Sequence, residues 1–135
     1  MKTIRKANSQ DYRRLLSSLR FVFKANPYIN IEYLKADISC GNCYIFEEDG
    51  KTLAVASLVY DDEHRMHYIK RLAIPNKRRR SKGYAKQFIE VLKDMAPIVA
   101  ATPWEENVAM RKILEQLGFI HRYTFNEYYM LYTSV

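Results

Sequence analysis

One segment of the sequence constrains the fold more than any other, because it joins an apolar run, a cationic loop and an amphipathic run in that order. The apolar run extends from about Met66 to Ile74, and Pro75 ends it because proline lacks the N–H that a strand needs. After the loop, the spacing predicts a helix from about Lys82 to Met95. Its apolar stripe consists of Ala85, Phe88, Leu92 and Met95.

A short apolar stretch follows this helix. Pro97 to Ala101 is bounded by prolines and predicts a buried strand, parallel to the strand at 66–74 and reached by a right-handed crossover. The sequence therefore predicts a strand–helix–strand unit in the middle of the chain.

The residues before this unit predict two helices and an antiparallel meander. Asp49-Gly50 lies between apolar runs of alternating pattern and is a strong hairpin signal. The expected elements are a strand at 3–7, a helix that begins after Asn8–Asp11 and ends near Phe23 before Asn26-Pro27, a helix at about 29–38, and strands at 43–46 and 52–60.

The residues after the unit predict one more helix and two final strands. Thr102 as the cap, Pro103 at the first helical position and Glu105 at the capping-box position mark the helix start, and Gly118 marks its end. Its buried stripe consists of Met110, Ile113, Leu114 and Leu117. The fold class is thus α+β, an α/β/α sandwich in which about four helices cover a mixed, mostly antiparallel sheet of about six to seven strands. At 135 residues, the chain is expected to form a single domain, 1–135.

The charge distribution and the hydropathy limit the kinds of partner that this chain is expected to bind. Of the net charge of +7, eight Lys or Arg and no carboxylate lie between Lys70 and Lys86. Such a concentration indicates an anionic partner, either the phosphates of a cofactor or a nucleic acid backbone, or else a solvated loop. Because the sequence has no run of about 20 apolar residues and no apolar signal core after Met1, we expect a cytoplasmic protein without a membrane partner.

The two cysteines do not favour a metal or redox site. Cys40 and Cys43 have the spacing of half a zinc site or a redox dithiol, and His64 and His67 are the remaining ligands within reach in the sequence. The spacing of the histidines is shorter than in zinc fingers, and no helix is signalled after Cys43. We therefore expect two partly buried thiols near the start of a strand and no metal.

The strand–loop–helix order also predicts a phosphate cradle. The first turn of a helix leaves backbone N–H groups unpaired, and an anion can satisfy them. Gly83 permits close approach to the backbone, and Ala85 keeps the next turn clear. The neighbouring Arg78, Arg79, Arg80 and Lys82 add positive charge.

This segment resembles the central motif of the GNAT superfamily of N-acetyltransferases. In that family a strand ends in an apolar turn, and Arg or Gln-x-x-Gly-x-Gly or Ala then leads into a helix. The sequence here reads Leu72-Ala73-Ile74-Pro75, then Arg80-Ser81-Lys82-Gly83-Tyr84-Ala85. Asn107, eleven residues before Gly118-Phe119, is similar to the family's second motif, so the resemblance covers nearly the whole chain.

The resemblance implies a cofactor site for acetyl-CoA. The strand edge at Leu72, Ala73 and Ile74 would pair with the pantetheine arm, and Arg80, Ser81, Lys82, Gly83, Tyr84 and Ala85 would hold the pyrophosphate. Arg78 or Arg79 would reach the ribose phosphate, and Asn107 would contact the cofactor near the second helix. The implied reaction is direct attack of an amine on the acetyl thioester.

The sequence departs from the family pattern at the general acid. Many family members place a Tyr seven residues after the motif Asn, where it protonates the departing thiolate. That position is Leu114, which the apolar stripe assigns to the core. Tyr123, Tyr128 and Tyr129 on the tail strands are the alternative acids, and packing is the alternative role for each of them.

Candidates for the general base lie on the strand before Leu72. Tyr68 has the same parity as Leu72 and Ile74 in a regular strand, and His67 has the more suitable ordinary pKa, near 6.5. Glu63 and His64 are less favoured because they fall in the turn.

The acceptor is not specified by the sequence. A small-molecule amine, a peptide amino terminus and a protein lysine all stay open, and a homodimer is compatible with such a chain. A basic module that binds nucleic acid is a disfavoured alternative because it leaves the helix after Thr102 unexplained. A CoA-binding regulator without catalysis is another.

Overall fold

All seven strands of the structure belong to one sheet. The computed structural model describes residues 1–18, 31–75, 83–125 and 129–135. The sheet order is β1-β2-β3-β4-β5-β7-β6, and only the β4–β5 pair is parallel. The strands are β1 (Lys2–Lys6), β2 (Cys43–Glu48), β3 (Lys51–Asp61), β4 (Met66–Ala73), β5 (Val99–Ala101), β6 (Ile120–Phe125) and β7 (Tyr129–Thr133). The helices are η1 (Ser9–Asp11, 3-10), α1 (Tyr12–Ser18), α3 (Ile31–Ser39), α4 (Tyr84–Lys93) and α5 (Val108–Gln116).

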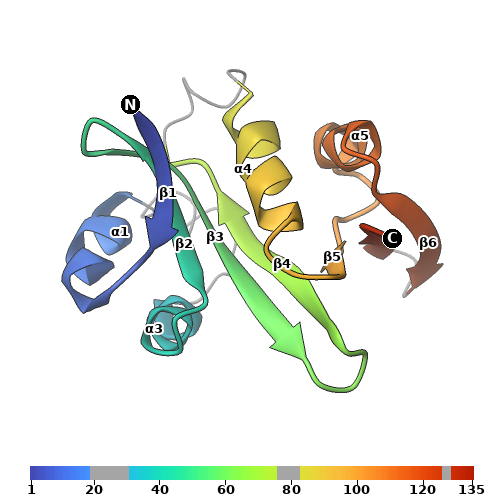
Figure 1. Ribbon diagram of the computed structural model, residues 1–135, viewed down its shortest axis with the longest axis horizontal. Coiled ribbons are helices and arrows are strands. Elements are labelled where there is room, and N and C mark those ends of the chain that lie inside the picture. The colour runs from blue at the N-terminus through green and yellow to red at the C-terminus, as the bar shows by residue number, and fades with distance from the viewer. Residues whose placement is uncertain (19–30, 76–82, 126–128) are drawn as a thin grey trace.

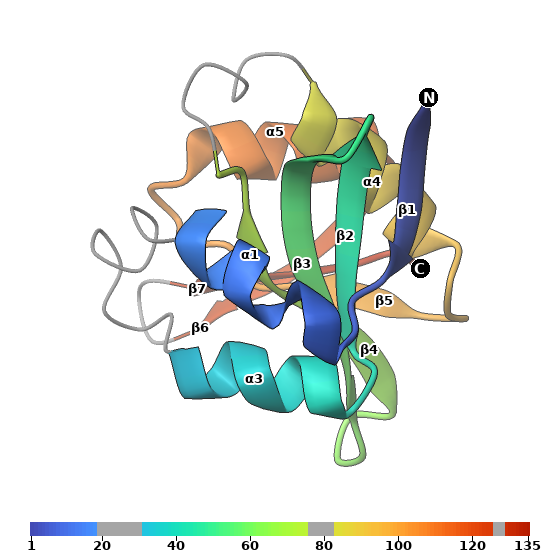
Figure 2. The ribbon, with the colours of Figure 1, turned by 90° about the vertical axis from the view of Figure 1, so that its left-hand side faces the viewer.

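Helices cover both faces of the sheet. Figures 1 and 2 show α1 and α3 on one face and α4 and α5 on the other. Each face has its own core: Leu15, Leu34 and Ile38 pack on β2 and β3 under α1 and α3. On the opposite face, Phe88, Ile89 and Leu92 of α4 pack with apolar residues of β3, β4 and β5. The predicted α/β/α arrangement, the mostly antiparallel sheet and the parallel crossover are confirmed.

Most predicted elements are present with shifted ends. Asn8 caps η1 through a capping box with Asp11, as the sequence indicated. The predicted helix end near Phe23, the break at Asn26-Pro27 and the second helix start near Ile29 lie outside the described residues. Helix α4 ends at Lys93, so Met95 is not part of its stripe and is 41% exposed. Since only three residues of β5 pair with β4, the strand predicted from Pro97 begins at Val99.

The start of the last helix differs from the prediction. The Thr102-Pro103-Trp104-Glu105 signal does not begin α5, which starts at Val108 with Asn107 as its cap. Residues 102–106 instead form an extended stretch and a turn, and Pro103 is buried. The predicted end is confirmed, because Gly118 has φ +87°, a left-handed conformation that glycine adopts without strain.

The cysteines and the C-terminus complete the fold. Cys43 is fully buried, which raises the pKa of its thiol to about 12, whereas Cys40 is exposed. Only one of the two thiols that were predicted to be partly buried is therefore inside.

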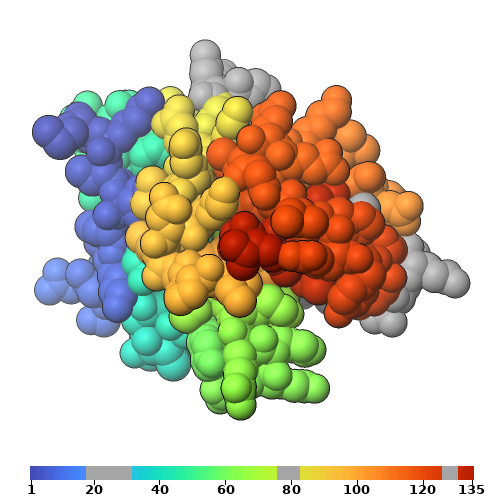
Figure 3. All heavy atoms as spheres, turned by 45° about the vertical axis from the view of Figure 1, so that its right-hand side comes forward, coloured from blue at the N-terminus to red at the C-terminus, as the bar shows by residue number. Residues whose placement is uncertain are grey.

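In the space-filling view the C-terminal residues, in dark red, lie between the yellow-orange surface that includes α4 and the orange-red surface that includes β6 (Figure 3). None of the described helices is both long and apolar enough to span a membrane.

Candidate active site

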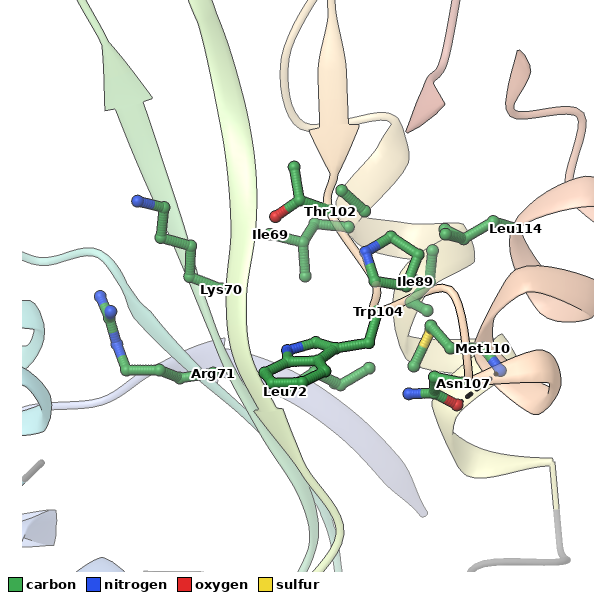
Figure 4. A pocket seen from close by; sticks show the side chains of 12 residues that line it. Ile69, Lys70, Arg71, Leu72, Ile89, Thr102, Trp104, Asn107, Met110 and Leu114 are labelled. Carbon is green, nitrogen blue, oxygen red and sulfur yellow. Dashed lines mark hydrogen bonds between the residues drawn. The ribbon is translucent and has the colours of Figure 1, made fainter. Parts of the chain in front are cut away.

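A β-bulge in β4 is the central irregularity of the sheet. Val55 pairs with Ala73 but Ser57 pairs with Lys70, so β4 has one residue more than β3 over this interval. Arg71 accommodates the extra residue with φ +54°, which is uncommon for a residue other than glycine. Lys70 and Arg71 therefore both project away from the side on which Ile69 and Leu72 lie (Figure 4). This bulge overturns the expectation that Tyr68 has the parity of Leu72, because the alternation is reset between them.

Helix α3 holds the side chain of the bulge residue. The Nε–H of Arg71 donates to Oδ2 of Asp37 at 2.7 Å, and its Nη2 lies 2.6 Å from the same oxygen. The hydroxyl of Ser57, on β3, also donates to this Oδ2 at 2.6 Å. The guanidinium lies 5.6 Å from the ring centroid of Tyr33. Because Asp37 and Ser57 are buried, this network fixes the bulge against α3 in a place where an unpaired charge would be costly.

The bulge opens a cleft between β4 and β5. The two strands pair from His67↔Val99 to Ile69↔Ala101, and among the described strands none pairs with β4 on that side beyond Ile69. A cavity of about 330 Å³ occupies the space. We call it the cleft; Ile69, Lys70, Arg71, Leu72, Ile89, Ala101, Thr102, Pro103, Trp104, Asn107, Met110 and Leu114 line it (Figure 4). Its apolar walls and the unpaired strand edge suit an extended chain that adds to the sheet through its backbone.

Asn107 presents a hydrogen-bond donor to the cleft. Its side-chain oxygen accepts from the N–H of Met110 at 3.2 Å and caps α5. The cap therefore fixes the amide so that its nitrogen points into the cleft (Figure 4). An asparagine suits this position because its side-chain oxygen caps α5 while its side-chain NH2 group is directed to a ligand.

The predicted phosphate cradle is described in part. Gly83 is exposed and precedes α4 with φ +80°, so the left-handed conformation there requires glycine. Ala85 is buried, and the ring of Tyr84 packs edge-on against Phe46 with centroids 6.0 Å apart. Lys2 lies 5.3 Å from the Tyr84 ring centroid. The other residues predicted to hold phosphates lie outside the described residues: Arg78, Arg79, Arg80, Ser81 and Lys82.

A second cavity adjoins the cleft. It has a volume of about 310 Å³, and we call it the aromatic pocket. His64, Tyr68, Thr102, Tyr123, Phe125 and Leu131 line it. Thr102 also lines the cleft, so the two cavities meet at that residue. The pKa of Tyr68 is raised by desolvation and by the negative charges of Asp61 and Glu63, which keeps its phenol protonated at neutral pH.

The structure separates the predicted catalytic residues. Tyr68 and Tyr123 lie together in the aromatic pocket. His67 lies outside both cavities; successive strand residues face opposite sides, and its ring packs on Tyr60 with centroids 5.0 Å apart. Of the tail tyrosines, Tyr128 and the side chain of Tyr129 lie outside the described parts.

His64, which the sequence disfavours as a general base because it falls in the turn, lines the aromatic pocket. Its Nδ1 lies 2.7 Å from Oδ2 of Asp61, and its ring lies edge-on to Tyr68 with centroids 6.5 Å apart. The hydrogen bond and the charge of Asp61 raise the pKa of His64 above its ordinary value of 6.5. The only sequence signal was the closeness of Asp61 and His64 in one turn, which by itself is common on protein surfaces.

The resemblance to GNAT proteins assigns an acid tyrosine to the position of Leu114. Its side chain is fully buried in the core formed with α4 and also borders the cleft. An apolar side chain cannot transfer a proton, so the assignment to packing is confirmed.

Comparison with known structures shows what this arrangement resembles. No protein-family profile and no curated protein matches the sequence. Among solved structures, a GNAT-family acetyltransferase from Streptococcus agalactiae superimposes with a TM-score of 0.81 at 20% identity, over 99% of this chain and 95% of that one. The chain has the GNAT fold. A GNAT-family acetyltransferase from Bacillus cereus gives a TM-score of 0.78 at 19% identity, over 98% and 96% of the two chains.

A further neighbour carries a ligand. The diaminobutyrate acetyltransferase from Paenibacillus lautus, in complex with L-2,4-diaminobutyric acid and coenzyme A, gives a TM-score of 0.74 at 15% identity, over 98% and 93% of the chains. At these identities the likeness establishes the GNAT fold, which the sequence resemblance predicted.

Proposed function

We propose that this chain is an acetyl-CoA-dependent N-acetyltransferase that binds acetyl-CoA in the cleft and an amine in the aromatic pocket. The observation that carries the proposal is the opening of a GNAT-fold sheet at a bulge. One side of the opening is the β4 edge beyond Ile69, where no described strand pairs with it, and the other carries the amide of Asn107. We keep the cytoplasm as its predicted location.

The cofactor contacts follow from the chemistry of acetyl-CoA. Its pantetheine arm carries amides that pair with the backbone of Leu72, Ala73 and Ile74, as an added strand would. The amide nitrogen of Asn107 donates to the same arm. The pyrophosphate lies at the N-terminus of α4, where Gly83, Tyr84 and Ala85 offer backbone N–H groups and the helix dipole favours negative charge. Arg79, Arg80, Ser81 and Lys82 complete this site in the proposal.

The reaction joins the two cavities near Thr102. The neutral amine attacks the thioester carbonyl carbon, the C–S bond breaks, the departing thiolate gains one proton, and the new amide nitrogen loses one. Since Leu114 supplies no acid, the hydroxyl of Tyr68 or Tyr123 is the proposed donor to the thiolate, and it regains its proton from the nitrogen.

The acceptor is a small amine in this proposal. Two structural neighbours with the same fold act, by their names, on spermidine and on diaminobutyrate. The aromatic pocket has a volume of about 310 Å³, and the rings of Tyr68, Tyr123 and Phe125 that line it can attract a cationic amine.

A release assay for free CoA tests the function. The protein is incubated with acetyl-CoA and, separately, with spermidine, L-2,4-diaminobutyrate, a peptide with a free amino terminus, and a lysine-containing peptide with a blocked amino terminus. Release above the rate without an amine supports the proposal. If acetyl-CoA raises the melting temperature but CoA is released with none of the acceptors, the result would favour a CoA-binding regulator without catalysis. Leu114, which supplies no acid, is the feature that fits this alternative.

A further inference from the structure

We infer that His64, held by Asp61, is the general base that removes the proton from the acceptor's ammonium group in the aromatic pocket. The inference rests on the proposed function, since it assigns a role in the same acetyl transfer. It differs from the sequence expectation, which placed the base at His67 or Tyr68.

The hydrogen bond to Asp61 determines which nitrogen of His64 is available. The pKa of the Asp61 carboxyl is lowered, chiefly by the hydrogen bond from His64, so it is ionised at neutral pH and can only accept. Nδ1, 2.7 Å away, must then carry the hydrogen. In the neutral ring, Nε2 is left with a lone pair that can take a proton.

Asp61 is itself fixed by the turn between β3 and β4. Its Oδ1 accepts from the backbone N–H of Glu63 at 2.9 Å. The carboxylate therefore has one oxygen on the backbone and the other on the imidazole, and it orients the ring rather than the reacting amine. In this arrangement Asp61 is a positioning residue, and His64 is the residue that contacts the substrate.

The location suits a proton acceptor for an incoming amine. His64 lines the aromatic pocket with Tyr68 and Tyr123, while Thr102 lies where the pocket meets the cleft. An ammonium that enters the pocket meets His64, transfers its proton to Nε2 and continues as the neutral amine that attacks the thioester; the imidazolium then releases the proton to solvent, since the side chain is 50% exposed.

The charged surroundings favour this transfer. Among the described residues, Asp61 and Glu63 of the same turn act on His64 electrostatically, the ring of Tyr68 on β4 contacts it, and Tyr123 on β6 lines the same pocket. Both carboxylates stabilise the imidazolium and raise the pKa of His64. The pKa of the Tyr68 phenol is raised, chiefly by desolvation, so this group is neutral at the same pH and does not compete for the proton.

The three histidines of the chain allow a matched test. Acetyl transfer is measured for wild type, His64→Gln, His67→Gln and His121→Gln with two probe amines: benzylamine, which is mostly protonated at neutral pH, and hydroxylamine, which is mostly neutral. His121 is exposed on β6, outside both cavities, and serves as the control. We expect His64→Gln to lower kcat/KM for benzylamine about 100-fold and to leave hydroxylamine within about twofold, because only benzylamine needs a base. His121→Gln leaves both unchanged.

The pH dependence supplies a second readout. In wild type, kcat/KM for benzylamine falls as the pH drops through the pKa of His64, which lies above 6.5. Asp61→Asn removes the charge that raises this pKa, so the fall in kcat/KM moves to lower pH. The pKa of the His64 ring, measured by NMR titration, should be lowered in the same variant. Three results would overturn the assignment. They are equal losses of kcat/KM for both amines in His64→Gln, a loss confined to benzylamine in His67→Gln instead, or an unchanged pH dependence in Asp61→Asn. Absence of transfer by wild type to these two amines and to all four acceptors of the release assay would instead contradict the proposed function itself.

Discussion

The cleft and the aromatic pocket meet at Thr102 but are built in different ways. The cleft depends on the backbone: a bulge at Arg71, the end of strand pairing at Ile69 and a capped helix at Asn107. The pocket depends on side chains from an outer turn and from the last strands of the sheet. If the proposed function holds, the difference teaches that backbone geometry specifies the cofactor site, whereas individual side chains specify the acceptor site.

The largest expected effect comes from the ion pair that holds the bulge. Asp37→Asn removes the charge that faces Arg71 and weakens the acceptor of the Ser57 hydroxyl. We expect a loss of about 3 kcal/mol in the free energy of unfolding, because breaking a buried pair leaves one charge uncompensated. Urea denaturation measures this loss, and acetyl-CoA affinity should fall in the same variant as the bulge loosens.

Asp94→Asn is the matched control for this change. Asp94 is an exposed carboxylate after α4, and its neutralisation should change stability by less than about 0.5 kcal/mol. If Asp37→Asn retained the stability and the acetyl-CoA affinity of Asp94→Asn, the cleft would not depend on this network.

A second test places a tyrosine in the cleft, at the position to which the GNAT resemblance assigns an acid. Leu114→Tyr places a larger, polar side chain in a fully buried site, so we expect destabilisation of about 2 kcal/mol and no gain in kcat. Leu114→Met conserves volume and should stay within about 1.5 kcal/mol of wild type. A stable Leu114→Tyr variant with higher kcat would show that the acid belongs in the cleft and not in the pocket.

The charge at the start of α4 is tested at Gly83. Both Gly83→Glu and Gly83→Gln introduce the same strain at a left-handed residue, so their difference isolates the charge. We expect Gly83→Glu to bind acetyl-CoA about tenfold more weakly than Gly83→Gln, which corresponds to about 1.4 kcal/mol. Calorimetric titration provides both affinities. Equal affinities would show that the pyrophosphate does not bind at the N-terminus of α4.

The smallest effect separates the two cavities directly. Asn107→Asp retains the cap oxygen and loses the amide donor, so KM for acetyl-CoA should rise about fivefold, the value of one hydrogen bond of about 1 kcal/mol, with stability retained. Tyr123→Phe should instead lower kcat/KM for the amine and leave KM for acetyl-CoA unchanged. Steady-state kinetics with each substrate varied in turn would contradict the division if both variants affected the same substrate.

The sequence predicted the elements better than their irregularities. The strand–helix–strand unit, the α/β/α layers and the closing Gly118 follow from periodicity and from residue conformational preferences, which act locally. The bulge could not be predicted, because Arg71 is no signal for a positive φ and is held there by Asp37, 34 residues away in the sequence. The predicted start of α5 is too early for a similar reason. Thr102 and Pro103 form a local helix-start signal, but in the structure both residues line the cleft and the helix begins after them.

The candidate site was predictable where it depends on a motif. Spacing and resemblance single out Gly83, Asn107 and Leu114; in the structure Gly83 precedes α4, Asn107 caps α5 and Leu114 lies in the core. The pairing of Tyr68 with Tyr123 and the orientation of His64 depend on how a turn and a distant strand meet, which no local pattern encodes.

Binding of acetyl-CoA in the cleft is the central claim, and the single tryptophan of the chain tests it most directly. Trp104 lines the cleft and is 43% exposed, so its fluorescence reports occupancy of that site alone. Titration with acetyl-CoA, excited where tyrosine does not absorb, should give a saturable change in Trp104 emission that Asn107→Asp shifts to higher concentration. Acetyl-CoA that binds by calorimetry but leaves the emission of Trp104 unchanged would contradict the claim.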